Sequence, residues 1–210
     1  YLLMQNISAD AYIEPFPHLV FHNFYTDEEL DLIWEELNFY TKPKKLFDVE
    51  DYQGVVGSTK AKAIALDSVF TGKTRVLSNI LTVSRKVFDS QILQPFSEIH
   101  DSCSLAKLAN YDITKVRYYH NGDYYKPHTD SYFEFLAFSY FYKEPKKFSG
   151  GNLIFPKYNH EFNCQNNSLI MFPSWVEHGV SEISIQDSDY FEGNGRYAIT
   201  HFFGCKEEKS

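Results

Sequence analysis

The sequence has 210 residues, which is enough for one sizeable core and short of two comfortable domains. Its 43% hydrophobic and 18% aromatic residues predict a globular protein with an aromatic-rich interior and exclude a disordered chain. The net charge of -8 argues against a general binder of nucleic-acid backbones, and the apolar runs are too short to cross a bilayer.

The cysteines and the first residues indicate the compartment. Cys103, Cys164 and Cys205 have no regular spacing, which favours reduced thiols over a disulfide framework. The opening "YLLMQN" lacks the basic flank and the full apolar core of a signal peptide. We therefore expect a cytoplasmic protein with no membrane partner.

Helical patterns dominate the N-terminal half. Thr26 followed by Glu29 reads as a capping box at the start of a helix. Its buried stripe has helical spacing and comprises Leu30, Ile33, Trp34 and Leu37. Residues 60–66, "KAKAIAL", predict a strand, and residues 74–96 carry the longest helical pattern, which Pro95 should end or kink.

After about residue 113, short β-rich segments follow one another, separated by glycine, proline and asparagine. They are "ITKVRYY", "FEFLAFSYFY", "GNLIFP", "SLIMFP", "GVSEIS" and "RYAITHFF". Serial short strands favour an all-β sandwich or barrel. We expect one domain over residues 1–210, with helical support over about 1–110 and a double-sheet β core over about 111–205.

A candidate metal site lies in "NGDYYKPHTD". His128 and Asp130 stand two apart, so on a strand they would point to the same face. They are two-thirds of a 2-His-1-carboxylate site, which binds non-haem Fe(II) and leaves coordination positions open. The third ligand could be any of His18, His22, His100, His120, His160, His178 and His201. His178 stands out because it lies between two predicted strands.

The segment "RYAIT" suggests an anion site. Arg196, Ala198 and Thr200 would share one strand face. A buried arginine is costly unless a carboxylate meets it, and that carboxylate could belong to a bound small molecule. The alternative, equally open from this segment alone, has Arg196 facing solvent and Tyr197 and Ile199 facing the core.

Together these motifs resemble the prolyl 4-hydroxylase-like family of Fe(II)/2-oxoglutarate-dependent dioxygenases. The metal-binding segment is similar to Tyr119-x-x-Gly122-x-x-Tyr125-x-Pro127-His128-x-Asp130. "SGGNLIFP" resembles the central Gly-Gly strand, "LIMFPSWVEHGV" the segment with the distal histidine, and "RYAIT" the strand with the cosubstrate-binding basic residue. The resemblance runs from about residue 15 to 203, with the motifs in the family's order.

The resemblance implies a double-stranded β-helix, or jelly roll, in a mostly β protein with N-terminal helices. It implies an iron site of His128, Asp130 and His178, and Arg196 as the residue that grips 2-oxoglutarate. Thr200, on the same face, would support Arg196. The remaining expected cosubstrate contacts are the tyrosines Tyr119, chosen over Tyr118 by family spacing alone, and Tyr140. The cofactors implied are Fe(II), 2-oxoglutarate and O2, with ascorbate as a reductant.

The resemblance also implies the reaction: hydroxylation of a C–H bond, with a prolyl residue in a peptide or protein as the favoured substrate. The alternatives are a free amino acid or another side chain, a catalytically silent jelly-roll binding module, or a cupin-like protein with another cofactor. Nucleic acid is disfavoured as a partner by the acidic balance. The gap from His178 to Arg196 exceeds the family's usual spacing, and we interpret "SIQDSDYFEGNG" as an elongated hairpin loop; a shifted register would leave Lys206 as the fallback.

Overall fold

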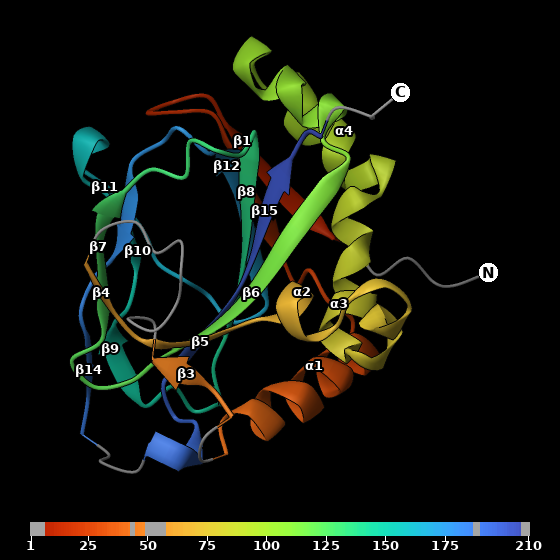
Figure 1. The fold of residues 1–210 in the computed structure, drawn as a ribbon. Coiled ribbons are helices and arrows are strands. Elements are labelled where there is room, and N and C mark those ends of the chain that lie inside the picture. The colour runs from red at the N-terminus through yellow and green to blue at the C-terminus, as the bar shows by residue number, and fades with distance from the viewer. Residues whose placement is uncertain (1–6, 43–44, 49–57, 187–189, 207–210) are drawn as a thin grey trace.

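A computed structural model describes residues 7–42, 45–48, 58–186 and 190–206. Two facing β-sheets form its centre, and helices cover the outer face of the larger sheet (Figure 1). In the described part of the chain, no helix is long and apolar enough to cross a membrane.

The larger sheet contains strands from both halves of the chain. Its order is β1 (Ser8–Tyr12), β2 (His18–His22), β12 (Ser168–Pro173), β8 (Phe135–Phe141), β15 (Arg196–Gly204), β6 (Tyr111–Tyr119), β5 (Lys62–Ala65) and β3 (Phe47–Asp48). Neighbouring strands in this order pair antiparallel.

The smaller sheet faces it across the interior (Figure 1). Its order is β11 (His160–Phe162), β10 (Leu153–Phe155), β13 (His178–Val180), β7 (Tyr124–His128) and β4 (Thr59–Lys60). A separate pair consists of β14 (Ile183–Ile185) and β9 (Phe148–Gly150). From β6 onward the chain passes repeatedly between the sheets, and β15 returns to pair with β6. This winding is a jelly roll.

The α-helices pack on the outer face of the larger sheet (Figure 1). The α-helices are α1 (Asp27–Tyr40), α2 (Leu66–Val69), α3 (Asn79–Val83) and α4 (Ser90–Glu98). The 3-10 turns are η2 (Gly72–Leu77), η3 (Ser84–Phe88), η4 (Asp101–Leu108), η5 (Pro156–Tyr158) and η6 (Tyr190–Glu192). The capping box of Thr26 and Glu29 is present at the start of α1. Ile33 and Leu37 of α1 are fully buried in the cluster between helices and sheet.

The predicted fold class is confirmed: mostly β, with N-terminal helices and a jelly-roll core. The two sheets remain separate rather than closing into one barrel. The expected division near residue 110 does not separate helices from sheets, because β1 to β5 precede it.

The helical pattern over residues 74–96 forms several short pieces instead of one long helix. Ser78 caps α3, and the extended backbone of Asp89 separates η3 from α4. Pro95 lies inside α4, which continues to Glu98. It therefore does not end the helix where the sequence suggested.

Candidate active site

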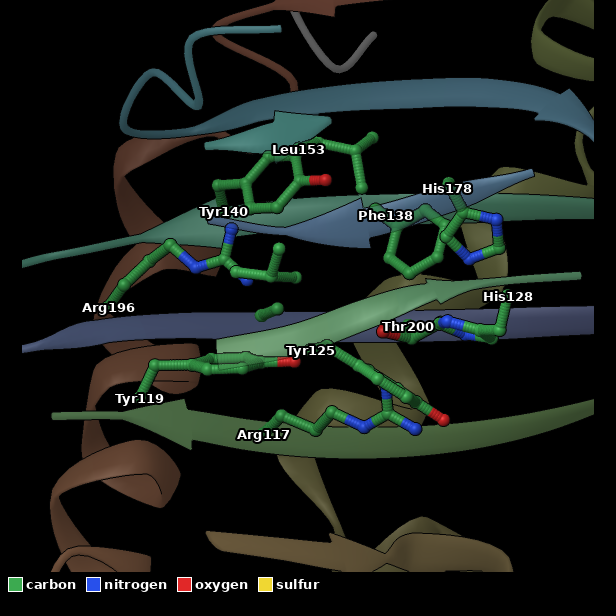
Figure 2. Close-up of a pocket in the computed structure, with 12 residues that line it drawn as sticks. Arg117, Tyr119, Tyr125, His128, Phe138, Tyr140, Leu153, His178, Arg196 and Thr200 are labelled. Carbon is green, nitrogen blue, oxygen red and sulfur yellow. The ribbon is translucent and has the colours of Figure 1, made fainter. Parts of the chain in front are cut away.

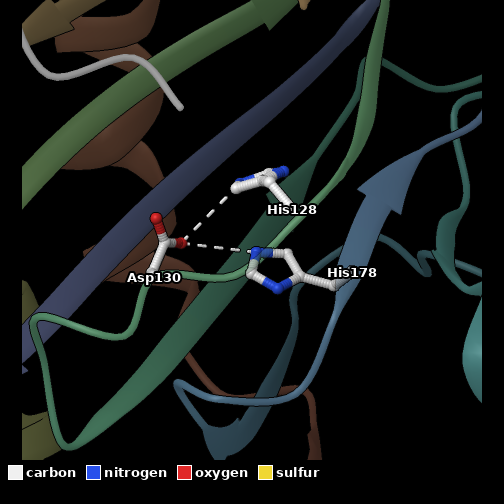
Figure 3. A group of neighbouring side chains, drawn as sticks. All are labelled: His128, Asp130 and His178. Carbon is white, nitrogen blue, oxygen red and sulfur yellow. Dashed lines mark ion pairs between the residues drawn. The ribbon is translucent and has the colours of Figure 1, made fainter. Parts of the chain in front are cut away.

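Three potential metal ligands meet between neighbouring strands of the smaller sheet. β7 and β13 are antiparallel, and His128 lies directly opposite His178 in their register. Asp130 follows β7 immediately, and its Oδ2 lies 3.8 Å from Nε2 of His128 and 3.4 Å from Nε2 of His178 (Figure 3). The ligand atoms of the three residues lie within 4.8 Å of one another. The residues predicted from the sequence thus converge on one point.

Hydrogen bonds orient both imidazoles. Nδ1 of His128 lies 2.9 Å from the carbonyl oxygen of Lys126, and Nδ1 of His178 lies 2.9 Å from that of Val176. A carbonyl oxygen can only accept, so each Nδ1 carries the proton and donates it. Each Nε2 is left with a free lone pair directed toward Asp130. This is the arrangement that metal-binding histidines use.

The protonation states also suit a cation. Burial, reinforced by the neighbouring His178, lowers the pKa of His128 to about 4. Burial alone would raise the pKa of Asp130, but its interactions with His178, His128 and Arg117 lower it below its usual range. A neutral imidazole beside an ionised carboxylate is what a divalent metal requires. The donor set fits Fe(II) in a facial triad.

A narrow pocket extends from the triad between the sheets (Figure 2). The free volume inside it is small, about 10 Å³. Its lining includes His128 and His178 of the triad, together with Arg117, Tyr119, Tyr125, Phe138, Tyr140, Leu153, Val180, Arg196, Ala198 and Thr200. The expected cosubstrate contacts Tyr119, Tyr140, Arg196 and Thr200 are all among them.

Arg196 is 1% exposed, yet within the described residues it forms no ion pair. One of its terminal nitrogens donates to the carbonyl oxygen of Gly151 and contacts Sγ of Cys164. Its guanidinium lies 4.5 Å from the ring centre of Tyr119 and 5.1 Å from that of Tyr140. Its buried Nε lacks a hydrogen-bond partner in the described structure. An incoming carboxylate would supply both the missing charge and the missing acceptor.

The strand register explains why these side chains meet. Arg196 of β15 lies opposite Tyr119 of β6, and Ala198 lies opposite Tyr140 of β8. Opposed residues share a face of the sheet, so Arg196, Tyr119 and Tyr140 all face the pocket. Of the two faces left open by the sequence, the one with Arg196 and Thr200 lines the pocket. Tyr197, on the other face, is buried against Trp34 of α1.

The same register resolves the choice between adjacent tyrosines. Tyr119 lines the pocket, while Tyr118 packs against Tyr197 in the cluster under the helices. Thr200 stands two residues after Ala198 and also faces the pocket. Its buried hydroxyl has no hydrogen-bond partner among the residues described.

The long gap between His178 and Arg196 is more than a hairpin loop. Ile183–Ile185 forms β14, which pairs with β9, and Tyr190–Glu192 forms η6. Residues 187–189 lie outside the described ranges. Lys206 lies beyond β15 with its Nζ over the ring of Tyr111, so the structure gives it no place in the pocket.

The Gly-Gly motif allows β9 to approach its neighbours. Gly150 has a φ of +70°, and a Cβ there would lie 2.0 Å from the carbonyl oxygen of Glu182. Gly151 has a φ of +69°, and its carbonyl oxygen accepts from Arg196. Glycine is required at both positions.

Sequence reasoning missed Arg117, a buried arginine that also lines this pocket. The signal was available: Arg117 stands two residues before Tyr119, so it shares that residue's strand face. Sequence reasoning also left out Cys164, whose buried thiol contacts Arg196. It lies in a loop whose position no periodicity predicts.

Comparisons with known proteins agree with this geometry. Residues 114–204 match the family model of the 2OG-Fe(II) oxygenase superfamily. No curated protein matched the sequence. The fold is similar to a Pseudomonas putida prolyl-4-hydroxylase, at 15% identity and a TM-score of 0.56, over 90% of this chain and 93% of that one.

Two further solved structures show the range of proteins with this fold. A viral collagen prolyl hydroxylase from Paramecium Bursaria Chlorella virus-1, solved as a 2OG complex, has 14% identity and a TM-score of 0.51, over 89% of this chain and 94% of that one. NgTET1 in complex with 5mC DNA has 15% identity and a TM-score of 0.56, over 90% of this chain and 72% of that one. At these identities the structural likeness establishes the fold and leaves the substrate open.

Proposed function

We propose that this chain hydroxylates a prolyl residue of a peptide or protein, because residues 114–204 match the model of the 2OG-Fe(II) oxygenase superfamily, whose cofactors are Fe(II), 2-oxoglutarate and O2. The observation that carries the chemistry is the convergence of His128, Asp130 and His178 at one end of a pocket with the buried Arg196 at the other. The prolyl substrate is supported by the motif resemblance and by the fold shared with prolyl hydroxylases.

In this proposal the chain's own residues bind and orient the reactants. His128, Asp130 and His178 would hold Fe(II) through Nε2, Oδ and Nε2. The bound metal supplies oxygen activation, coupled to oxidative decarboxylation of 2-oxoglutarate to succinate and CO2. Arg196 binds the distal carboxylate of 2-oxoglutarate by charge-assisted hydrogen bonds.

The remaining lining residues position the cosubstrate and the metal ligands and shield them from water. The hydroxyls of Tyr119 and Thr200 face the space beside Arg196 and can hydrogen-bond the cosubstrate. Tyr125 stacks on His128 at 3.9 Å between ring centres and fixes its plane. Phe138 lies 5.5 Å from His178 and, with Leu153, keeps water from this part of the pocket.

A direct test uses a proline-containing peptide and the same peptide with alanine in place of proline. With Fe(II) and 2-oxoglutarate, we expect the first peptide to gain one oxygen atom by mass spectrometry and to stimulate succinate release. The second peptide should do neither, and Asp130→Ala should abolish both readouts with either peptide. Succinate release that no prolyl peptide stimulates would overturn the prolyl assignment while preserving the dioxygenase assignment.

A further inference from the structure

A second buried arginine faces the pocket near the metal ligands. Arg117 is 7% exposed, and its guanidinium lies 4.7 Å from the ring centre of Tyr125. Figure 2 shows Arg117 extending beneath Tyr125 toward the end that carries His128, whereas Arg196 enters from the opposite end. The distal carboxylate expected at Arg196 therefore does not explain Arg117.

Arg117 has no carboxylate partner of its own. It forms no ion pair with any residue that the structure describes, and its buried Nε has no hydrogen-bond partner there. Asp130 is the carboxylate whose charge acts on it, and Asp130 is committed to the metal triad. Tyr119 hydrogen-bonds the guanidinium but is neutral, so a bound anion would offset the desolvation cost of this buried charge.

Lys115 adds a second cation to the same strand face. It stands two residues before Arg117 on β6, and its Nζ lies 5.0 Å from the ring centre of Phe202. Burial, reinforced by the charge of Arg117, lowers the pKa of Lys115 to about 8, against the opposing charge of Asp130. Opposite Lys115 and Arg117 on β15 stand Thr200 and the small Ala198.

The side chains that face the pocket keep an excess of positive charge when the cofactors bind. The charged side chains described on the pocket faces of β6 and β15 are the cations Lys115, Arg117 and Arg196, and the triad contributes the carboxylate of Asp130. Fe(II) and 2-oxoglutarate carry equal and opposite charges, so together they do not change this balance. The loaded pocket stays positive, which is complementary to an anionic substrate.

We propose that Arg117, supported by Lys115, binds a carboxylate of the primary substrate beside the metal centre. The inference rests on the proposed dioxygenase function and narrows its substrate class. The carboxylate could belong to a free amino acid or to an acidic side chain next to the target residue in a peptide. Both sources share the chemistry that a guanidinium recognises.

The test compares charged and neutral probes of the same shape. L-proline against L-prolinamide tests a free carboxylate, and acetyl-Glu-Pro-amide against acetyl-Gln-Pro-amide tests a side-chain carboxylate. Binding is measured by anaerobic calorimetry on the full chain loaded with Fe(II) and 2-oxoglutarate. In at least one pair we expect the charged member to bind at least about thirty-fold more tightly, the typical effect of a buried charge pair.

Substitutions assign the effect to Arg117. Arg117→Gln should remove the preference for the charged probe, and Arg117→Lys should retain part of it. The matched control is Arg85→Gln, because Arg85 is half exposed and pairs with Asp112 outside the pocket. This control should bind every probe as the wild type does.

Several outcomes would overturn the inference. The first is that the charged and neutral probes of both pairs bind equally well or not at all. The second is that Arg117→Gln keeps the preference for the charged probe. The third is that Arg117→Gln loses affinity for 2-oxoglutarate, which would make Arg117 a cosubstrate residue. The visible charge-transfer band of the Fe(II)–2-oxoglutarate complex separates the two proposals. If the wild type shows the band but binds charged and neutral probes equally, only this inference is wrong. If the wild type shows no band, the proposed function is wrong.

Discussion

Replacing Arg196 with methionine separates cosubstrate binding from iron binding and from folding. The methionine keeps much of the apolar stem but removes the guanidinium, which is 1% exposed and has no described carboxylate partner. In the cosubstrate complex this guanidinium would form a buried charge pair. Loss of one member of such a pair costs about 2–5 kcal/mol, which corresponds to roughly thirty-fold to a few thousand-fold in affinity for 2-oxoglutarate.

Arg196→Met should have little effect on the stability of the protein without 2-oxoglutarate. The methionine leaves the carbonyl oxygen of Gly151 without its donor, but it also removes a buried, unpaired charge. We therefore expect the free energy of unfolding to stay within about 1 kcal/mol of the wild type, since a lost hydrogen bond has that size. Affinity for Fe(II) alone should be unchanged, because Arg196 forms no hydrogen bond or ion pair with the triad residues in the described structure.

The assay is an anaerobic titration of each variant with Fe(II) and then with 2-oxoglutarate, beside a urea unfolding curve of the metal-free protein. Arg196→Lys serves as the matched control, because it keeps a charge but loses the planar fork, and it should bind 2-oxoglutarate with intermediate affinity. Equal losses of Fe(II) and 2-oxoglutarate affinity in Arg196→Met would refute the reasoning. So would unchanged affinity for 2-oxoglutarate.

Three further predictions concern the ligands, a buried histidine and the Gly-Gly motif. Asp130→Ala and His178→Ala should each abolish Fe(II) binding while the circular dichroism spectrum stays native; retained Fe(II) affinity would remove that residue from the site. Burial lowers the pKa of His201 to about 4, so between pH 6.5 and 4 the unfolded chain binds a proton that the folded chain resists, and stability falls as pH falls. His201→Leu should lose about 2 kcal/mol less than the wild type between pH 7.5 and 5 in urea unfolding, and parallel pH curves would contradict the assignment. Gly150→Ala should lower the free energy of unfolding by about 2 kcal/mol or more, because the residue has a φ of +70° and its Cβ would collide with a carbonyl oxygen; wild-type stability would contradict that account.

Local patterns in the sequence predicted the serial short strands, and the family resemblance implied the jelly roll. Strand parity placed His128 and Asp130 on one face, and the resemblance selected His178 as the third candidate ligand. The family spacing selected Tyr119 over Tyr118, and the strand pairing with Arg196 explains why that choice places Tyr119 in the pocket.

Several features of the fold depend on strand pairing between distant segments, which local sequence patterns do not predict. The pairing of β2 with β12 joins segments about 150 residues apart in the sequence, and no local period reports it. The break of the 74–96 pattern arises at Ser78 and Asp89, whose extended backbones begin new helical pieces. Arg117 was missed although it stands two residues before Tyr119 and so shares its strand face.

The most direct measurement is an anaerobic titration of the metal-free protein with Fe(II) and then 2-oxoglutarate, followed by visible absorption. Chelation of a 2-oxo acid to Fe(II) in a facial triad gives a weak charge-transfer band. We predict that the band appears only when both are present and bleaches when oxygen is admitted. A folded protein that takes up no iron and shows no band would contradict the account and favour a silent jelly-roll binding module.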